Sequence, residues 1–482
     1  MNHFETLGAE MSILLKNGTI ITATETFEAD ILIEGEKITM VGKGLPEPEG
    51  VQVIDASGKY ILPGGVDVHT HFDLPMFATV SSDDHYSGHK AAGFGGTTTV
   101  IDFIPQDVQP LLKNVEAWHT KADEKAAIDF SFHMNITRFD SQVAKEIPSL
   151  MDEGISTLKV FTAYNNRLRL QDGEIFQVLR IAREHGMLVM AHCENGDVIE
   201  LLVKEALEAG HTEPIWHART RPAWGEVESI HRAIALAGQA GAPIYIVHMT
   251  TAGGVIQLER ARQKGLPVMG ETCPQYLFFS EENLKQEDAS KWICSPPVRT
   301  AMDNRELWRG LENGTLQVIG TDHCAFFYDG TKPIDYEGKP IAIPGKELGK
   351  GDFTKIPNGL PGVGDRLPVL WTHGVGQKRF TPNQFVALTS TQPAKIFGLY
   401  PQKGSLMPGA DADVVIWDAQ LNYTYGVKEA RHRTDYNLYE GWQLQGGIEK
   451  VFLRGNLIRD GSNWLGKRGM GKFIRRSAPQ VI

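Results

Sequence analysis

Residues 157–192, TLKVFTAYNNRLRLQDGEIFQVLRIAREHGMLVMAH, place a short apolar run on each side of a helical stretch. Within 174–186 the apolar residues recur three and four positions apart, which is the spacing of one helix face. The flanking runs, 157–161 and 187–192, are mostly apolar, as strands buried on both faces of a parallel sheet are. This stretch therefore predicts two parallel strands joined by a crossover helix.

The same alternation extends in both directions along the chain. Six more strands are expected at 65–71, 97–103, 128–134, 243–248, 266–273 and 316–322, with helical segments such as 198–210 and 254–265 between them. Eight strands with intervening helices over about 250 residues predict a closed TIM-type (β/α)8 barrel. An open doubly wound sheet is the alternative, but no G-x-G-x-x-G follows a strand and no P-loop is present.

The two ends of the chain have a different pattern. Short β-type runs separated by glycines fill residues 12–62, and similar runs return at 410–418 and 448–461. We expect one small β-sandwich domain built from both ends. Its N-terminal part would be residues 1–64, after a short extension, the barrel would be 65–400, and the C-terminal part with a tail would be 401–482.

Composition narrows the possible partners and location. The 482 residues carry a net charge of −11, with 41% hydrophobic residues, so neither nucleic acid nor an anionic membrane is an expected partner. No apolar run approaches the roughly 20 residues of a membrane span, and the N-terminus lacks the features of a signal peptide. We expect a cytoplasmic protein. The basic cluster near the C-terminus is expected to be a solvated tail or a subunit contact; it comprises Lys467, Arg468, Lys472, Arg475 and Arg476.

Polar residues of ligand type end five of the eight predicted strands. They are His69 and His71, Lys159, His192, His248 and Asp322. The carboxyl ends of the strands form the active-site face of a TIM barrel, and residues i and i+2 share one face of a strand. The pattern therefore predicts a metal site. Imidazole and carboxylate ligands suit zinc, with manganese, iron, cobalt or nickel chemically possible.

Two other sets of residues compete for that role. His85 and His89 stand four apart on an expected helix outside the barrel, without the glutamate of an H-E-x-x-H motif, and we expect them to be solvent or interface residues. The four cysteines form no CxxC pair and are expected to be small buried apolar side chains.

Lys159 is unusual among these residues because a buried ammonium is costly and would repel a metal. Reaction of its amine with CO₂ would give a carbamate, an anion with two oxygens that could bridge two cations. Lys159 therefore favours a pair of metals over a single one.

Several segments around these residues resemble those of a known family. GGVDVHTHFDLP (64–75), LKVFTAYNN (158–166), GETCPQYL (270–277), GTDHCAF (320–326) and GDFTKIPNGLPGV (351–363) are similar to segments of the dihydropyrimidinases and D-hydantoinases of the amidohydrolase superfamily. The matches run in order from about residue 60 to 365, and LMPGADADVVIWD (406–418) resembles the superfamily's return to its β-sandwich.

The resemblance implies a complete catalytic site with two divalent metals, expected to be zinc. His69, His71 and Asp322 would hold one metal, His192 and His248 the other, and Lys159, as N6-carboxylysine, would bridge them. A hydroxide between the metals would attack the ring carbonyl, and Asp322 would carry its proton to the leaving nitrogen. Tyr164 would stabilise the oxyanion, and backbone groups of Ser295 and Asn358 would hold the ring amides. The resemblance also implies a homotetramer with the C-terminal tail in subunit contacts.

The expected reaction is hydrolytic opening of cyclic amides, either 5,6-dihydropyrimidines or hydantoins, to N-carbamoyl amino acids. No arginine follows His71 to pair a substrate carboxylate, which disfavours dihydroorotate. Leu74, Met76 and Phe77 instead suggest a pocket for hydrogen or apolar ring substituents. An insertion around 326–345 follows the last strand, where it could reshape substrate entry or an interface.

Two alternatives remain. One is an allantoinase-like or other amidohydrolase of cyclic amides. The other is a non-enzymatic scaffold, because dihydropyrimidinase-related proteins of this fold lack several ligands. All six ligand positions are present here, which favours an enzyme.

Overall fold

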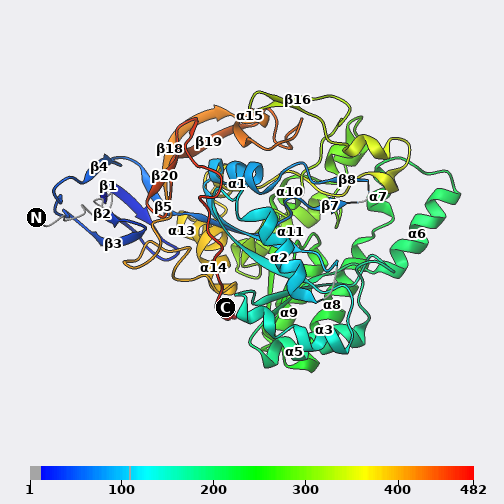
Figure 1. Cartoon of the computed structure of the whole chain (residues 1–482). Coiled ribbons are helices and arrows are strands. Elements are labelled where there is room, and N and C mark those ends of the chain that lie inside the picture. Colours follow the sequence, from blue (N-terminus) through cyan, green and yellow to red (C-terminus); the bar gives the residue numbers. More distant parts are fainter. Residues whose placement is uncertain (1–11, 77, 108–109) are drawn as a thin grey trace, which may run out of the picture.

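The computed structural model describes residues 12–76, 78–107 and 110–482, and it consists of a barrel and a separate sheet (Figure 1). The strands from the two chain ends, blue and orange in Figure 1, lie beside the barrel and its surrounding helices. No described helix is both long and apolar enough to span a membrane.

The barrel contains eight parallel strands, each overlapping a run predicted from the sequence. They are β6 (Gly65–Thr70), β9 (Thr97–Ile104), β10 (Asp129–Asn135), β11 (Thr157–Phe161), β12 (Leu188–His192), β13 (Ile244–Ile246), β14 (Val268–Thr272) and β15 (Val318–Ile319). The two ends of this sheet meet through a parallel bridge between Thr70 and His323, where the His71 amide donates to the His323 carbonyl over 2.7 Å. The predicted barrel is therefore confirmed, and an open doubly wound sheet is excluded.

The helices follow the predicted alternation with the strands. The α-helices are α1 (His85–Phe94), α2 (Leu111–Ala122), α3 (Ser141–Glu146), α4 (Ser149–Asp152), α5 (Asp172–Glu184), α6 (Gly196–Glu208), α7 (Ile215–Arg219), α8 (Ala223–Ala240), α9 (Ala252–Gln263), α10 (Pro274–Phe278), α11 (Ala301–Glu312), α12 (Arg366–Leu370), α13 (Pro382–Val386), α14 (Gln392–Ile396) and α15 (Val427–Ala430). In α8, Val227, Ile230, Ile234 and Ala237 form the buried face, with the spacing of an amphipathic helix. The helix ends at Gly241, whose φ of 63° is open to glycine at little cost.

Six short helical segments complete the described helical structure. They are η1 (Asn283–Lys285), η2 (Ala289–Trp292), η3 (Lys346–Gly349), η4 (Phe353–Lys355), η5 (Trp371–Val375) and η6 (Ala387–Thr391). Of these, η5 continues α12, and η6 joins α13 to α14.

The barrel has an apolar core that determines which side chains point inward. Leu188 and Met190 pack in it with residues of five other strands, and α14 and Ile474 contribute to the same cluster. His192 shares the face of Leu188 and Met190 because alternate residues of a strand point the same way. The core therefore directs His192 toward the barrel axis at the end of its strand.

Strands from both ends of the chain form one nine-stranded sheet. They are β1 (Ser12–Ile21), β2 (Thr26–Glu34), β3 (Lys37–Gly42), β4 (Gln52–Asp55), β5 (Tyr60–Pro63), β18 (Val414–Thr424), β19 (Gln443–Leu453), β20 (Asn456–Asp460) and β21 (Asn463–Trp464). The two ends join where β5 pairs with β18 antiparallel and with β1 parallel. This sheet has its own core, in which Ile31 and Ile33 of β2 pack with Val414 and Ile416 of β18.

The tail differs from expectation at its last basic residue. Phe473 forms a bridge with Phe130, and the Arg476 side chain is only 4% exposed. Its guanidinium donates to the Phe132 carbonyl and, over 2.7 Å, to Thr157 Oγ1. The expectation of a solvated tail or subunit contact is therefore wrong for Arg476, whose side chain is buried against strands β10 and β11 of the same chain.

The expectation for His85 and His89 is also wrong. Both side chains are fully buried, and their rings lie 5.7 and 5.4 Å from the ring of Phe72. Helix α1 packs against the barrel through this face, so the two histidines are part of the core between helix and strands.

Two hairpins follow strand ends of the barrel. One joins β7 (Pro75–Met76) to β8 (Thr79–Val80), and Phe77, expected to line the substrate pocket, lies outside the described residues. The other, β16 (Ile334–Tyr336) with β17 (Lys339–Ile341), belongs to the insertion. Glu337 of this hairpin forms a 2.7 Å ion pair with Lys90 of α1, which ties the insertion to the helical shell.

Candidate metal centre and substrate site

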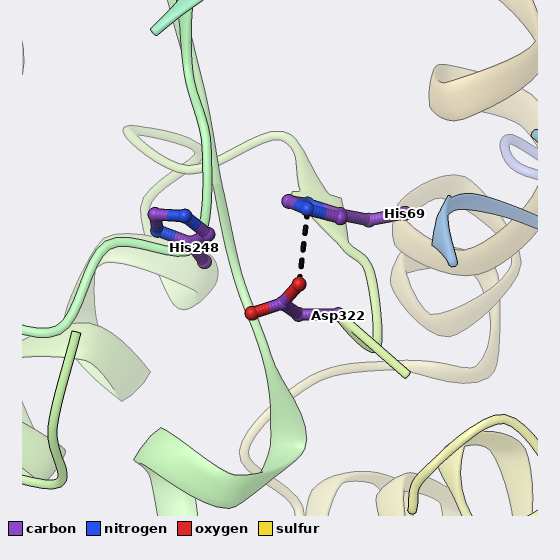
Figure 2. A group of neighbouring side chains, drawn as sticks. All are labelled: His69, His248 and Asp322. Atoms are coloured by element: carbon purple, nitrogen blue, oxygen red, sulfur yellow. Dashed lines mark ion pairs between the residues drawn. The ribbon is translucent and has the colours of Figure 1, made fainter. Parts of the chain in front are cut away.

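The six side chains predicted as metal ligands converge at the carboxyl ends of the barrel strands. Ligand atoms of His69, His248 and Asp322 all lie within 4.8 Å of one another. Figure 2 shows the two histidines facing Asp322 from different sides. The remaining three, His71, Lys159 and His192, are each within 3.4 Å of one of these residues.

Asp322 is the shared partner of the His-Thr-His pair. Its Oδ1 lies 3.1 Å from Nε2 of His69 and 3.1 Å from Nε2 of His71. Asp322 has a φ of 52°, so the backbone takes a left-handed conformation three residues after the end of β15. That turn brings one carboxylate oxygen between two imidazoles from the opposite end of the barrel sheet.

His192 and His248 form the second half of the cluster. Nδ1 of His192 lies 2.9 Å from Nε2 of His248, and Nε2 of His192 lies 2.8 Å from the Glu194 carboxylate. His192 ends β12, and His248 follows two residues after the end of the neighbouring, hydrogen-bonded strand β13.

Lys159 lies beside the first half of the cluster, and its charge acts on ligands of both halves, His71 and His248. Its Nζ is 3.4 Å from Nε2 of His69 and 4.5 Å from the centre of the Phe103 ring, and the side chain is 2% exposed. No carboxylate among the described residues lies within ion-pair distance of this amine. Burial lowers the pKa of Lys159 to about 8, although Asp322 and Glu271 oppose the shift. The neutral amine, which is the form that reacts with CO₂, is therefore within reach near neutral pH.

Glu271, on β14, is a residue that the sequence interpretation missed. Its carboxylate is fully buried and contacts Nδ1 of His69, while it accepts from the His248 amide at 3.1 Å and from the Tyr245 hydroxyl at 2.9 Å. A carboxylate on the far ring nitrogen fixes the tautomer and orientation of a ligand histidine. The sequence did contain a signal for this role, because Glu271 is an acidic residue near the end of the strand predicted at 266–273.

The protonation states of the cluster suit a metal ion. Burial lowers the pKa of His71 to about 4, and it lowers that of His248 well below its usual value. Burial works against ionisation of Asp322, but the adjacent His69 and His71 outweigh it and hold the pKa of the carboxyl well below its usual range. Neutral imidazoles and an ionised carboxylate are the forms that coordinate metals, and His71, His248 and Asp322 have them. The pKa of His69 is raised instead, because burial and the charge of Lys159, which lower it, are outweighed by Glu271 and Asp322.

Unsatisfied nitrogens give an independent indication of a metal. Nδ1 of His71 and Nδ1 of His248 are buried without a hydrogen-bond partner in the described part of the chain. Buried polar atoms normally have partners, so each such atom requires an explanation. A donor set of imidazoles and a carboxylate fits zinc and similar divalent ions. The residues present therefore fit a metal centre.

The cysteines do not contribute to this centre. All four are free and buried, as expected, and none belongs to the His/Asp cluster of the described residues. Burial raises the pKa of the Cys193 thiol, which keeps it protonated beside the ligand His192.

The three residues expected to bind substrate lie around the same strand ends. The Tyr164 ring is 5.1 Å from the His192 ring, and burial raises the pKa of its hydroxyl, which therefore remains a proton donor. Nδ2 of Asn358 donates to Ser295 Oγ over 3.1 Å, so these two residues are adjacent although 63 positions apart. Within the described residues, no hydrogen bond involves the backbone amide or carbonyl of either one. Those four groups are free to bind a ligand.

Comparison with known proteins agrees with this geometry. The amidohydrolase family matches residues 60–458. The chain is 45% identical to the D-hydantoinase of Geobacillus stearothermophilus over 97% of each protein, and 40% identical to a D-phenylhydantoinase of Escherichia coli over 98% of this chain and 100% of the relative. A crystal structure of dihydropyrimidinase from Brevibacillus agri superposes with a TM-score of 0.93 at 43% identity, covering 98% of this chain and 100% of the other.

Proposed function

The chain belongs to the amidohydrolase family, within its hydantoinases and dihydropyrimidinases, and on that premise we propose that it opens 5,6-dihydropyrimidines and hydantoins at a centre of two divalent metals. The chain is a hydrolase of cyclic amides, and the products would be N-carbamoyl amino acids. The observation that carries the two-metal proposal is Lys159, a buried amine that lies 3.4 Å from the ligand His69 and has no acidic partner among the described residues.

The proposed ligands are the six converging residues. His69, His71 and Asp322 would hold one ion, His192 and His248 the other, and Lys159, carboxylated on its amine, would bridge the pair. We propose zinc, because imidazole nitrogens and carboxylate oxygens in a buried site suit it. When bound, such metals supply a water molecule activated for attack at neutral pH.

The chain's own residues would perform the remaining steps. Asp322, ionised and exposed to the centre, would accept a proton on its carboxylate and pass it to the leaving ring nitrogen. The Tyr164 hydroxyl would donate to the carbonyl oxygen as negative charge develops there. The free backbone groups of Ser295 and Asn358 would pair with the ring amides and orient the carbonyl carbon.

Two alternatives are less well supported than this function. An allantoinase-like enzyme would use a similar centre, but the relatives described above are named hydantoinases and dihydropyrimidinase. A non-enzymatic scaffold would have no need for the complete donor set. The homotetramer and the cytoplasmic location expected from the sequence stay predictions, the first of which light scattering on the purified protein would test.

Initial rates on a panel of rings test the proposed function. The panel contains dihydrouracil, hydantoin, both enantiomers of 5-phenylhydantoin, allantoin and dihydroorotate. We expect turnover of the dihydropyrimidine and the hydantoins, and little of dihydroorotate, because no arginine follows His71 to bind its carboxylate. Preferential turnover of dihydroorotate or allantoin would contradict the proposal.

A further inference from the structure

The backbone around Ser295 is held by partners on both of its sides. The Ile293 carbonyl accepts from Lys346 Nζ at 3.0 Å and from the Gly359 amide at 3.1 Å. The Cys294 carbonyl accepts from Nε2 of His217 at 2.8 Å, and the Pro296 carbonyl accepts from the Tyr276 hydroxyl at 2.8 Å. In the described part of the chain, neither the amide nor the carbonyl of Ser295 has a hydrogen-bond partner.

Lys346 also reaches the second segment that carries free backbone groups. Its Nζ donates to the Pro357 carbonyl at 3.0 Å, directly before Asn358. No other donor among the described residues reaches that carbonyl. One amine therefore connects a position two residues before Ser295 with a position one residue before Asn358.

The environment of this amine is costly for the protein. The side chain is 1% exposed, and among the described residues no carboxylate lies within ion-pair distance of it. Burial lowers its pKa to about 7. A buried amine with only carbonyl partners contributes little net stability, whereas an apolar side chain of this length would fill the space without that cost. Donation to two carbonyls is what lysine adds at this position.

Lys346 also stands where the insertion ends. Its backbone amide donates to the Phe327 carbonyl at 2.7 Å, and the Glu347 carboxylate accepts from the amides of Gly330 and Gly345 at 2.8 and 3.0 Å. These bonds close the base of the insertion. The backbone of Lys346 is therefore held in place by these bonds, and its side chain extends from there into the protein interior.

We propose that Lys346 is a positioning residue that fixes the Ser295 and Asn358 segments at the separation required for their backbone groups to grip the two amides of a substrate ring. The inference rests on the proposed function, because it assigns ring binding to those groups. Lys346 does not touch the substrate; it acts through the Ile293 and Pro357 carbonyls. A displacement of about 1 Å in a substrate-positioning group can cost about 10²-fold in rate, so loss of the link should be visible in kinetics.

The test compares Lys346→Met with a matched control. Methionine has similar length and no donor, and Lys350→Met makes the same change on an exposed lysine four residues away. We expect Lys346→Met to raise KM for dihydrouracil and hydantoin at least tenfold, with kcat changed less and metal content equal to wild type. Lys350→Met should match wild type in all three.

Hydrogen–deuterium exchange of the metal-loaded protein gives a readout independent of turnover. Lys346→Met should speed exchange in peptides covering 290–297 and 356–361, but not in 64–72. Unchanged exchange in these peptides would overturn the proposal that Lys346 fixes the Ser295 and Asn358 segments. Faster exchange together with a wild-type KM would show that Lys346 stabilises these segments without affecting substrate binding, which would also overturn the positioning role. If the methionine variant does not fold, Lys346→Gln, which is too short to reach both carbonyls, is measured identically. If the wild-type protein opens no ring in the panel, the proposed function fails. The exchange measurement alone then tests whether Lys346 fixes the two segments.

Discussion

Replacing Glu271 by glutamine keeps the shape of the side chain but puts an amide where three donors point. The carboxylate contacts Nδ1 of His69, the His248 amide and the Tyr245 hydroxyl, and it is fully buried. Oε1 serves both histidine contacts and Oε2 the Tyr245 hydroxyl, so the amide oxygen would stay with the histidines and the NH₂ would face the hydroxyl, whose proton would lose its acceptor. The His69 ring would lose the negative charge that fixes its tautomer and orientation.

The size of the effect follows from the role of such partners. Removing a carboxylate that orients a ligand histidine costs about 10- to 100-fold in metal affinity or activity, which is about 1.4–2.7 kcal/mol. Because Glu271 contacts one histidine from each half of the centre, we expect the upper part of that range. Competition with a chelating dye measures zinc affinity, and initial rates on dihydrouracil measure kcat/KM.

A matched control separates orientation from charge loss. Glu259→Gln removes a carboxylate on α9 that pairs with Arg309 at 2.9 Å, away from the barrel mouth, and should leave both quantities at wild-type values. A Glu271→Gln variant whose zinc affinity and kcat/KM both stay within twofold of wild type would refute the orienting role of Glu271.

Three further changes test other parts of the account. Lys159→Ala should abolish ring opening, and acetate or propionate should restore part of the rate by supplying a bridging carboxylate; an active, metal-replete variant without added acid would contradict the bridge. Tyr164→Phe should lower kcat about 10²- to 10³-fold by removing an oxyanion donor, and an unchanged kcat would exclude that role. Arg476→Ala should destabilise the fold by about 1–3 kcal/mol, because buried acceptors of the barrel lose their donor. Thermal unfolding measures this, with the exposed Lys467→Ala expected to match wild type.

Much of the barrel could be predicted because its signals are local. Apolar runs that carry polar residues identify strands such as β11 and β12, and the helical spacing of α5 identifies the crossover between them. Parallel strands of one barrel must end on the same face. That constraint predicted from the sequence alone that His69, His192 and Asp322 lie close together.

The predictions that were wrong concern contacts distant in sequence. His85 and His89 were expected on a helix outside the barrel, and only the packing of Phe72 against α1 shows that they are buried. Arg476 belongs to a basic run typical of solvated tails, yet it lies against a strand 344 positions earlier. Glu271 and Lys346 were missed because their roles depend on partners from other strands and loops.

The metal content of the purified protein tests the central claim most directly. Elemental analysis by mass spectrometry, on protein from cells grown with added zinc, measures ions per chain. We expect two ions per chain in wild type and a clear loss in Lys159→Ala, because the bridge between the two halves of the centre would be absent. A wild-type value near zero would contradict the metal centre, and a value of one would contradict the bridging lysine.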